Sequence, residues 1–64
     1  MKVESEFRLS RIQAEGWNAA RRIPVSQLGE IDVKSIEELN PYSAKSQRLR
    51  WSAGFNNALA SWRR

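Results

Sequence analysis

Neither cysteine nor histidine occurs in this chain of 64 residues, and their absence limits the interactions that can stabilise its fold. Chains this short bury only about 60% of the surface that they expose when unfolded, and they usually need a disulfide, a metal or a partner subunit. A disulfide is impossible here, a zinc site of the usual cysteine and histidine type is excluded, and no cofactor is expected. We therefore predict one small domain held by hydrophobic packing, with a homo-oligomer as a further source of support.

The same composition argues against catalysis. Without histidine there is no histidine-based triad and no histidine proton shuttle. Glu37 and Glu38 are adjacent, so in a helix they lie on different faces and form no acid and base pair. No glycine-rich loop precedes a helix in the manner of a phosphate-binding loop. We predict that the protein is not an enzyme.

Two prolines divide the chain into two long segments and a connection. Pro24 ends the first segment, whose hydrophobic period predicts an amphipathic helix over about residues 4–22. Its apolar arc consists of Leu9, Ile12, Gly16, Ala19, Ala20 and Ile23. The opposite side carries Arg8, Arg11, Glu15, Asn18 and Arg22. Phe7 and Trp17 lie off the arc, and we assign them to a hydrophobic staple and an edge contact, respectively.

The second long segment begins at Pro41, a residue suited to the first position of a helix, with Asn40 as the N-cap. We expect this helix to span about residues 41–62. Its apolar arc consists of Ala44, Trp51, Gly54, Phe55, Ala58, Leu59 and Trp62. Trp51 lies at the centre of the arc and is expected in the core. Trp62, near the end of the helix, fits either the core or a base-stacking surface.

Each helix carries a glycine and an alanine four residues apart on its apolar arc: Gly16 with Ala20, and Gly54 with Ala58. Glycine inside a helix costs about 1 kcal/mol relative to alanine, so these positions indicate a close helix crossing or space for a tryptophan ring. We predict an all-α fold, an antiparallel two-helix hairpin. Its expected core consists of Ile12, Gly16, Ala20, Trp51, Phe55 and Ala58.

The connection, residues 24–40, holds most of the acidic charge of the chain. Its acidic residues are Glu30, Asp32, Glu37 and Glu38. Asp32 or Ser35 caps a short third helix or turn here. Two roles are open for the connection. Either its acidic charge masks the cationic second helix, or its apolar side chains form a docking ridge for a protein partner. That ridge would consist of Ile31, Val33, Ile36 and Leu39.

Eleven lysines and arginines against seven acidic residues give a net charge of +4, a balance that attracts polyanions such as nucleic acid. The candidate nucleic-acid contacts are Lys45, Arg50, Arg63, Arg64, Arg21 and Arg22. Arg48 lies on the flank of the buried arc. There it either covers a tryptophan, pairs with a carboxylate such as Glu15, or contacts a phosphate.

No apolar run of about 18 residues predicts a transmembrane helix, and the first residues lack the apolar core of a signal peptide. We therefore expect a cytoplasmic protein that makes no membrane contact.

A series of motifs resembles the ribosome modulation factor family of small bacterial proteins. The residues that carry the resemblance are Gly16, Trp17, Ala19 and Ala20, then Asn40, Pro41 and Tyr42, then Arg48, Trp51, Gly54, Phe55 and Ala58. From Pro41 onward every spacing agrees with the family pattern. The N-terminal segment is less basic than in that family, and the connection is longer and more acidic.

The resemblance implies an α-helical hairpin that binds the small ribosomal subunit near the message-reading end of its RNA. In stressed cells, ribosomes bound in this way would pair and become translationally inactive. The motif residues resemble a packing pattern, so they carry over the architecture more directly than the function.

We predict a non-enzymatic, ribosome- or RNA-associated regulator of translation that binds through a cationic helix face. The alternative is a small protein-binding adaptor or inhibitor on the same hairpin, of the kind that a mobile element encodes. Its docking groups would be Leu49, Ala53 and Phe7. Salt distinguishes the two, because RNA binding weakens steeply with ionic strength whereas apolar docking does not.

Overall fold

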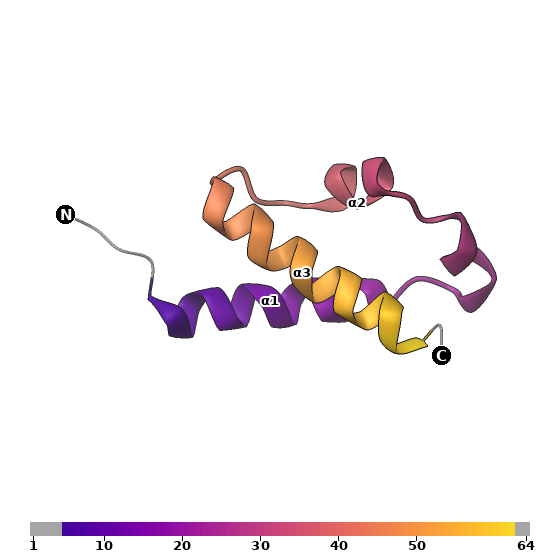
Figure 1. The fold of residues 1–64 in the computed structure, drawn as a ribbon, viewed down its shortest axis with the longest axis horizontal. Helices are drawn as coiled ribbons and strands as arrows, with labels where there is room; N and C mark the ends of the chain where they lie inside the picture. Colours follow the sequence, from indigo (N-terminus) through magenta and orange to yellow (C-terminus); the bar gives the residue numbers. More distant parts are fainter. Residues whose placement is uncertain (1–4, 63–64) are drawn as a thin grey trace.

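The computed structural model describes residues 5–62, apart from the side chains of Val25 and Leu28, and this part of the chain is helical with no strand. Three α-helices and one 3-10 helix follow one another: α1 (Glu6–Arg21), η1 (Val25–Glu30), α2 (Val33–Leu39) and α3 (Lys45–Trp62) (Figure 1). The all-α prediction is confirmed, and so is a short third helix in the connection.

Ser5 caps the first turn of α1. Its backbone is extended, and its hydroxyl oxygen accepts a hydrogen bond from the backbone N–H of Arg8 at 3.1 Å. With Ser5 as the cap, Phe7 becomes the second residue of the helix and cannot act as a staple, which requires the residue before the cap. The staple prediction is therefore wrong, and 75% of the Phe7 surface is exposed.

Asp32, rather than Ser35, caps α2. Its Oδ1 accepts a hydrogen bond from the backbone N–H of Ser35 at 2.8 Å. This bond stabilises the ionised carboxylate and lowers the pKa of Asp32 below its usual value. α2 ends at Leu39, because the residue before Pro41 is disfavoured in the helical conformation.

The predicted start of the second long helix is wrong, because α3 begins at Lys45 rather than Pro41. Asn40 is 8% exposed, and its side chain bonds to distant groups instead of capping a helix. Its Nδ2 donates to the carbonyl of Arg48 at 3.1 Å and to the hydroxyl of Ser52 at 3.2 Å. These bonds hold residues 40–44 against α3 as an irregular segment. Ala44 is exposed in this segment and is not part of the core.

The pairing of two long helices is as predicted, but their antiparallel sense is not. Arg50, early in α3, contacts Glu6 at the start of α1, and Trp62 at the end of α3 contacts Trp17 late in α1. Both helices therefore run in the same direction, obliquely to each other, as Figure 1 shows. The connection explains this sense. α1 is about 24 Å long, and residues 22–44 are enough chain to return to its beginning.

The two helices cross at their glycines with the backbones in contact. A Cβ atom on Gly16 would overlap the carbonyl oxygen of Trp51 and lie 2.9 Å from its carbonyl carbon. A Cβ atom on Gly54 would overlap the carbonyl oxygen of Gln13 in the same way. Of the two explanations offered for these glycines, a close crossing is the one that the structure shows.

The core fills the space around this crossing. Its buried apolar members are Leu9, Ile12, Ala20, Ile36, Trp51, Phe55, Ala58 and Leu59. The rings of Trp51 and Phe55 stack with their centroids 5.2 Å apart. All six residues of the expected core are buried, since Gly16 also lies on the buried side of α1.

The proposed docking ridge on the connection is present in part. Ile36 is buried and belongs to the core, whereas Val33 and Leu39 on the same helix are exposed. Ile31, Val33 and Ile36 line one cavity of about 320 Å³ together with Leu59 of α3. Leu39 lines a different cavity, beside Pro41 and Trp51. Docking of a protein partner on this surface stays a prediction.

Candidate nucleic-acid interface

The cations singled out from the sequence do not gather on one surface. Arg21 and Arg22 are exposed at the end of α1, whereas Lys45 is exposed at the start of α3. Because α1 and α3 run in the same direction, these residues lie at opposite ends of the helix pair (Figure 1). Arg63 and Arg64 lie outside the described residues.

Arg50 is engaged across the helix pair. Its Nη2 lies 2.9 Å from Oε1 of Glu6, and its Nη1 donates to Oε1 of Gln13 at 3.4 Å. The side chain is 32% exposed. Its own helix offers no acidic neighbour, but α1 does, and this contact links the first halves of the two helices.

Arg48 has a structural role, with partners other than Glu15. Its Nη1 donates to the carbonyl of Tyr42 at 2.5 Å, and its Nη2 donates to the carbonyl of Glu37 at 3.2 Å. The second bond satisfies a carbonyl in the last turn of α2, where helices leave such groups without a partner. Asn40 and Arg48 together form what we term the Asn40–Arg48 clasp, which fastens the connection to α3.

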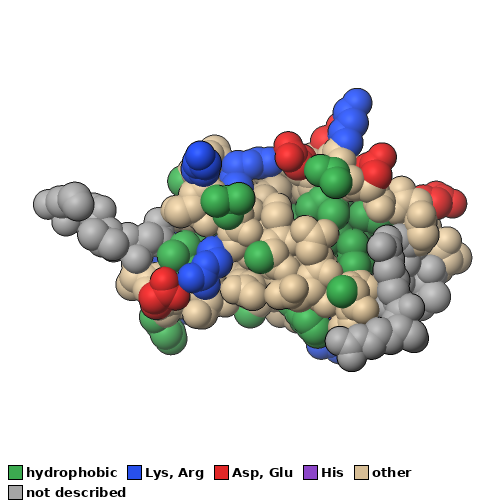
Figure 2. Space-filling view, viewed as in Figure 1, with side chains coloured by type: hydrophobic (Ala, Val, Ile, Leu, Met, Phe, Trp, Pro, Cys, Tyr) green, Lys and Arg blue, Asp and Glu red, His purple; other side chains and the backbone are tan. Residues whose placement is uncertain are grey.

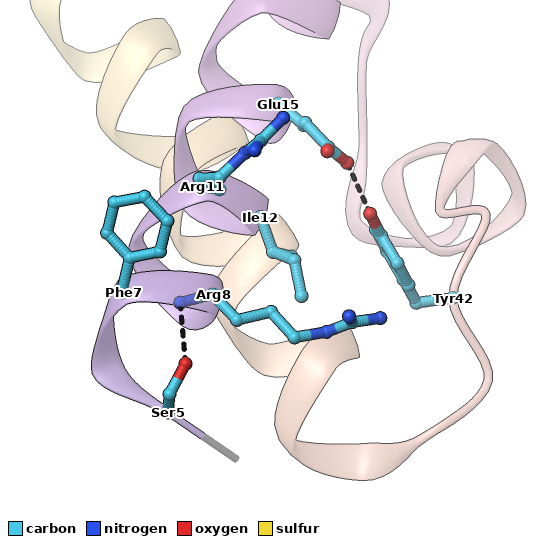
Figure 3. Close-up of a pocket in the computed structure, with 7 residues that line it drawn as sticks. All are labelled: Ser5, Phe7, Arg8, Arg11, Ile12, Glu15 and Tyr42. Atoms are coloured by element: carbon cyan, nitrogen blue, oxygen red, sulfur yellow. Dashed lines mark hydrogen bonds between the residues drawn. The ribbon is translucent and has the colours of Figure 1, made fainter.

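A groove with a volume of about 510 Å³ lies between the first half of α1 and Tyr42 (Figure 3). We term it the Tyr42 groove. Its lining residues are Ser5, Phe7, Arg8, Arg11, Ile12, Glu15 and Tyr42. Ile12 is also part of the core, so the groove is built on a rigid base.

One stripe of α1 supplies the charged side chains of the groove. Arg8, Arg11 and Glu15 are spaced by three and four residues, which places them on one face of the helix. Figure 3 shows Arg8 extending toward Tyr42, while Phe7 stands on the other side of the groove. The groove thus combines two cations, one carboxylate and two aromatic rings.

Tyr42 is held from three directions. Its backbone N–H donates to Oδ1 of Asn40 at 3.0 Å, and its carbonyl accepts from Arg48. Its hydroxyl donates to Oε1 of Glu15. The Asn40–Arg48 clasp therefore fixes the backbone of Tyr42, and Glu15 fixes its ring.

The electrostatics of the groove converge on the Tyr42 hydroxyl. The hydrogen bond to Glu15 raises the pKa of Tyr42 above its usual value, and burial and the negative charge of Glu15 act in the same direction. The charges of Arg8 and Arg11 act in the opposite direction. Both arginines line the same groove as this hydroxyl.

A second group of aromatic and basic residues lies at the other end of the helix pair. The rings of Trp17 and Trp62 have centroids 6.3 Å apart and are tilted by 54°. Trp62 contacts Trp17 and keeps 39% of its surface exposed, so it is not part of the core, and base stacking stays a prediction. Arg21 follows Trp17 by four residues and shares its face of α1.

The acidic connection lies beside the start of α3. Glu37 and Lys45 line the same cavity, whose volume is about 240 Å³. Figure 2 shows acidic side chains gathered over α2, next to basic side chains over the start of α3. This arrangement meets the geometric requirement of the masking hypothesis, which stays a prediction.

From the sequence, Arg8, Arg11 and Glu15 lie together on one side of the first helix, but they were not expected to form a site. Tyr42 was expected only as a motif residue. The helical spacing of Arg8, Arg11 and Glu15 predicts that they share a face of α1. It does not predict the path of the connection, which brings Tyr42 over that face.

Within residues 5–62, no group of three or more acidic, histidine or cysteine side chains is arranged to hold a metal ion. None of the helices described combines the length and the apolar character that a membrane crossing requires. Comparison with protein-family models, with curated proteins and with solved structures found no match for this chain.

Proposed function

We propose that the protein is a non-enzymatic, ribosome- or RNA-associated regulator that binds RNA through the Tyr42 groove. One observation carries the proposal: Arg8 and Arg11 line the same groove of about 510 Å³ as the Tyr42 ring, and Arg8 extends toward that ring (Figure 3). Guanidinium groups bind phosphate through paired hydrogen bonds, and aromatic rings stack on unpaired bases. The net charge of +4 adds a long-range attraction for a polyanion.

The resemblance to ribosome modulation factor gives this RNA-binding proposal its cellular setting. In this chain the motif residues Gly16, Gly54 and Arg48 serve the helix crossing and the clasp. Trp51 and Phe55 form the centre of the core. These motif residues support a packing pattern related to that of the family. The resemblance adds a target to the proposal, which is ribosomal RNA in the cytoplasm of a bacterium.

We expect the double charge reversal Arg8→Glu with Arg11→Glu to weaken binding to single-stranded RNA at least about tenfold. The two substitutions remove both groove cations and repel phosphate. If two phosphate contacts are lost, the slope of log K against log salt becomes shallower by about 1.4. Fluorescence anisotropy of a labelled RNA, titrated at about 50 to 200 mM salt, measures both quantities.

The matched control is Arg21→Glu with Arg22→Glu, which makes the same charge change at the other end of α1. It should weaken RNA binding far less. The free energy of unfolding of both double variants should lie within about 0.5 kcal/mol of the wild-type value, as is usual for surface substitutions. Equal losses in the two variants would mean that RNA responds to overall charge and not to the groove.

A second candidate function is the protein-binding adaptor or inhibitor. It is favoured by Leu49, which is 62% exposed and borders the cavity shared by Glu37 and Lys45. Binding through this side chain would depend little on salt and would be lost on Leu49→Ser. RNA binding through the Tyr42 groove would be unaffected by that substitution, so one variant separates the two functions.

A further inference from the structure

We propose that the Tyr42 groove selects an unpaired guanine nucleotide and that Glu15 recognises the base. The inference rests on the proposed RNA-binding function and adds the class of base that the groove takes. Phosphate binding does not explain why a carboxylate, Glu15, lines the groove beside the Tyr42 hydroxyl.

A carboxylate in a phosphate-binding groove is unfavourable by itself, because it repels the phosphate. An ionised carboxylate only accepts hydrogen bonds, so it pairs only with a base edge that presents donors. The Watson–Crick edge of guanine presents two adjacent donors, the ring N1–H and the exocyclic amino group. Adenine and cytosine present one amino group beside an acceptor, and uracil presents one N–H between two carbonyls. Guanine is thus the base that matches both oxygens of Glu15.

Glu15 is oriented for this contact before any ligand arrives. Its Oε1 accepts the hydrogen bond from the Tyr42 hydroxyl, and the backbone of Tyr42 is fixed by the Asn40–Arg48 clasp. A carboxylate has about four acceptor sites, so one bond to Tyr42 leaves others for a base. Tyr42 is therefore a positioning residue for Glu15 and also forms one wall of the groove.

Both arginines lie on one side of Glu15, where the sugar–phosphate backbone of such a base can run. Arg11 and Arg8 precede Glu15 by four and seven residues, about 6 and 10 Å along the helix axis. A guanine edge at Glu15 therefore leaves its own backbone near the guanidinium groups. The groove volume of about 510 Å³ is within the usual range for small-ligand sites, so it suits one nucleotide and not a duplex. In a duplex the same edge of guanine is already paired with cytosine.

The test compares short uridine-rich RNAs that differ at one central position. The labelled strands carry guanine, inosine or uracil there, and a duplex form of the guanine strand and free GMP are tested as separate arms. We expect the wild type to bind the guanine strand about tenfold more tightly than the uracil strand, the scale of one paired base contact. Inosine keeps N1–H but lacks the amino group, so its affinity should fall between the two.

Glu15→Gln is the decisive variant, because it keeps the shape of the side chain and replaces one acceptor oxygen by a donor. It should bind all three strands with similar affinity, while a thermal melt shows that it stays folded. Glu38→Gln on α2 makes the same chemical change outside the groove and should keep the guanine preference.

The outcomes separate this inference from the proposed function. A wild type that binds the three strands equally overturns guanine selection and leaves RNA binding intact. A wild type that binds no RNA but binds GMP supports a guanine site and overturns the RNA-binding function. A preference that survives Glu15→Gln shows that another group reads the base and contradicts the assignment of Glu15.

Discussion

Gly16→Ala is expected to leave the chain largely unfolded. The added methyl group would overlap the carbonyl oxygen of Trp51 on α3, and a backbone atom cannot rotate away as a side chain can. Overpacking in a core usually costs about 1 to 3 kcal/mol, because the side chains nearby can shift. Here α1 and α3 themselves must separate, so we expect a larger cost. The whole free energy of unfolding of a domain this small is only about 3 to 5 kcal/mol, so the substitution should unfold it. A thermal melt followed by far-UV circular dichroism measures the effect.

Gly54→Ala should have the same effect from the other helix, because its methyl group would overlap the carbonyl oxygen of Gln13. Gly29 in η1 offers the matched control, since a Cβ atom there meets nothing within 4 Å and its φ is not positive. Gly29→Ala should leave the protein as stable as the wild type or stabilise it by about 0.4 to 1 kcal/mol. If Gly16→Ala melts at the same temperature as the wild type, the close crossing is contradicted.

Trp51→Ala is the second substitution expected to unfold the domain. Trp51 is 3% exposed and stacks on Phe55, which has no exposed surface. Removing a buried tryptophan costs about 3 to 5 kcal/mol, which is comparable to the whole stability of the domain. We expect a loss of most helical signal at room temperature, measured by circular dichroism and by a urea titration.

Trp62→Ala is the control for this substitution, because it removes the same side chain from the exposed end of the same helix. Trp62 keeps 39% of its surface exposed and rests on Trp17 at the periphery. We expect a cooperative melt at a moderately lower temperature. Equal destabilisation by the two substitutions would show that the core is not centred on Trp51.

The two long helices and their buried faces could be predicted because their signals are local. The spacing of Ile12, Gly16 and Ala20, and that of Trp51, Phe55 and Ala58, follows the helical period. Glycine at a buried helical position is unfavourable unless a neighbour needs the space, so Gly16 and Gly54 indicated either a close crossing or space for a tryptophan ring. The structure shows the crossing.

The start of α3 was missed because tertiary contacts override a local preference. Pro41 after Asn40 is a common way to begin a helix. Here Asn40 bonds instead to Arg48 and Ser52, which lie eight and twelve residues further along the chain. No local pattern reports such bonds.

The direction of the helix pair was missed for a related reason, since amphipathic faces pair equally well in either sense. The length of the connection decides it, and the clasp fixes the result. The Tyr42 groove depends on that path, because Glu15 and Tyr42 are 27 residues apart in sequence. From the sequence, Glu15 belonged to the polar side of a helix and Tyr42 to a motif, and their contact exists only in the folded chain.

Co-sedimentation of the tagged protein with ribosome fractions, at low and at moderate salt, tests the proposed function most directly. The wild type should sediment with ribosomes at low salt and partly dissociate at moderate salt, because phosphate contacts weaken as salt rises. Arg21→Glu with Arg22→Glu should keep most of the association. Arg8→Glu with Arg11→Glu should abolish it at both salt concentrations while melting like the wild type. If that groove variant sediments with ribosomes at the wild-type level, the Tyr42 groove is not the RNA-binding site.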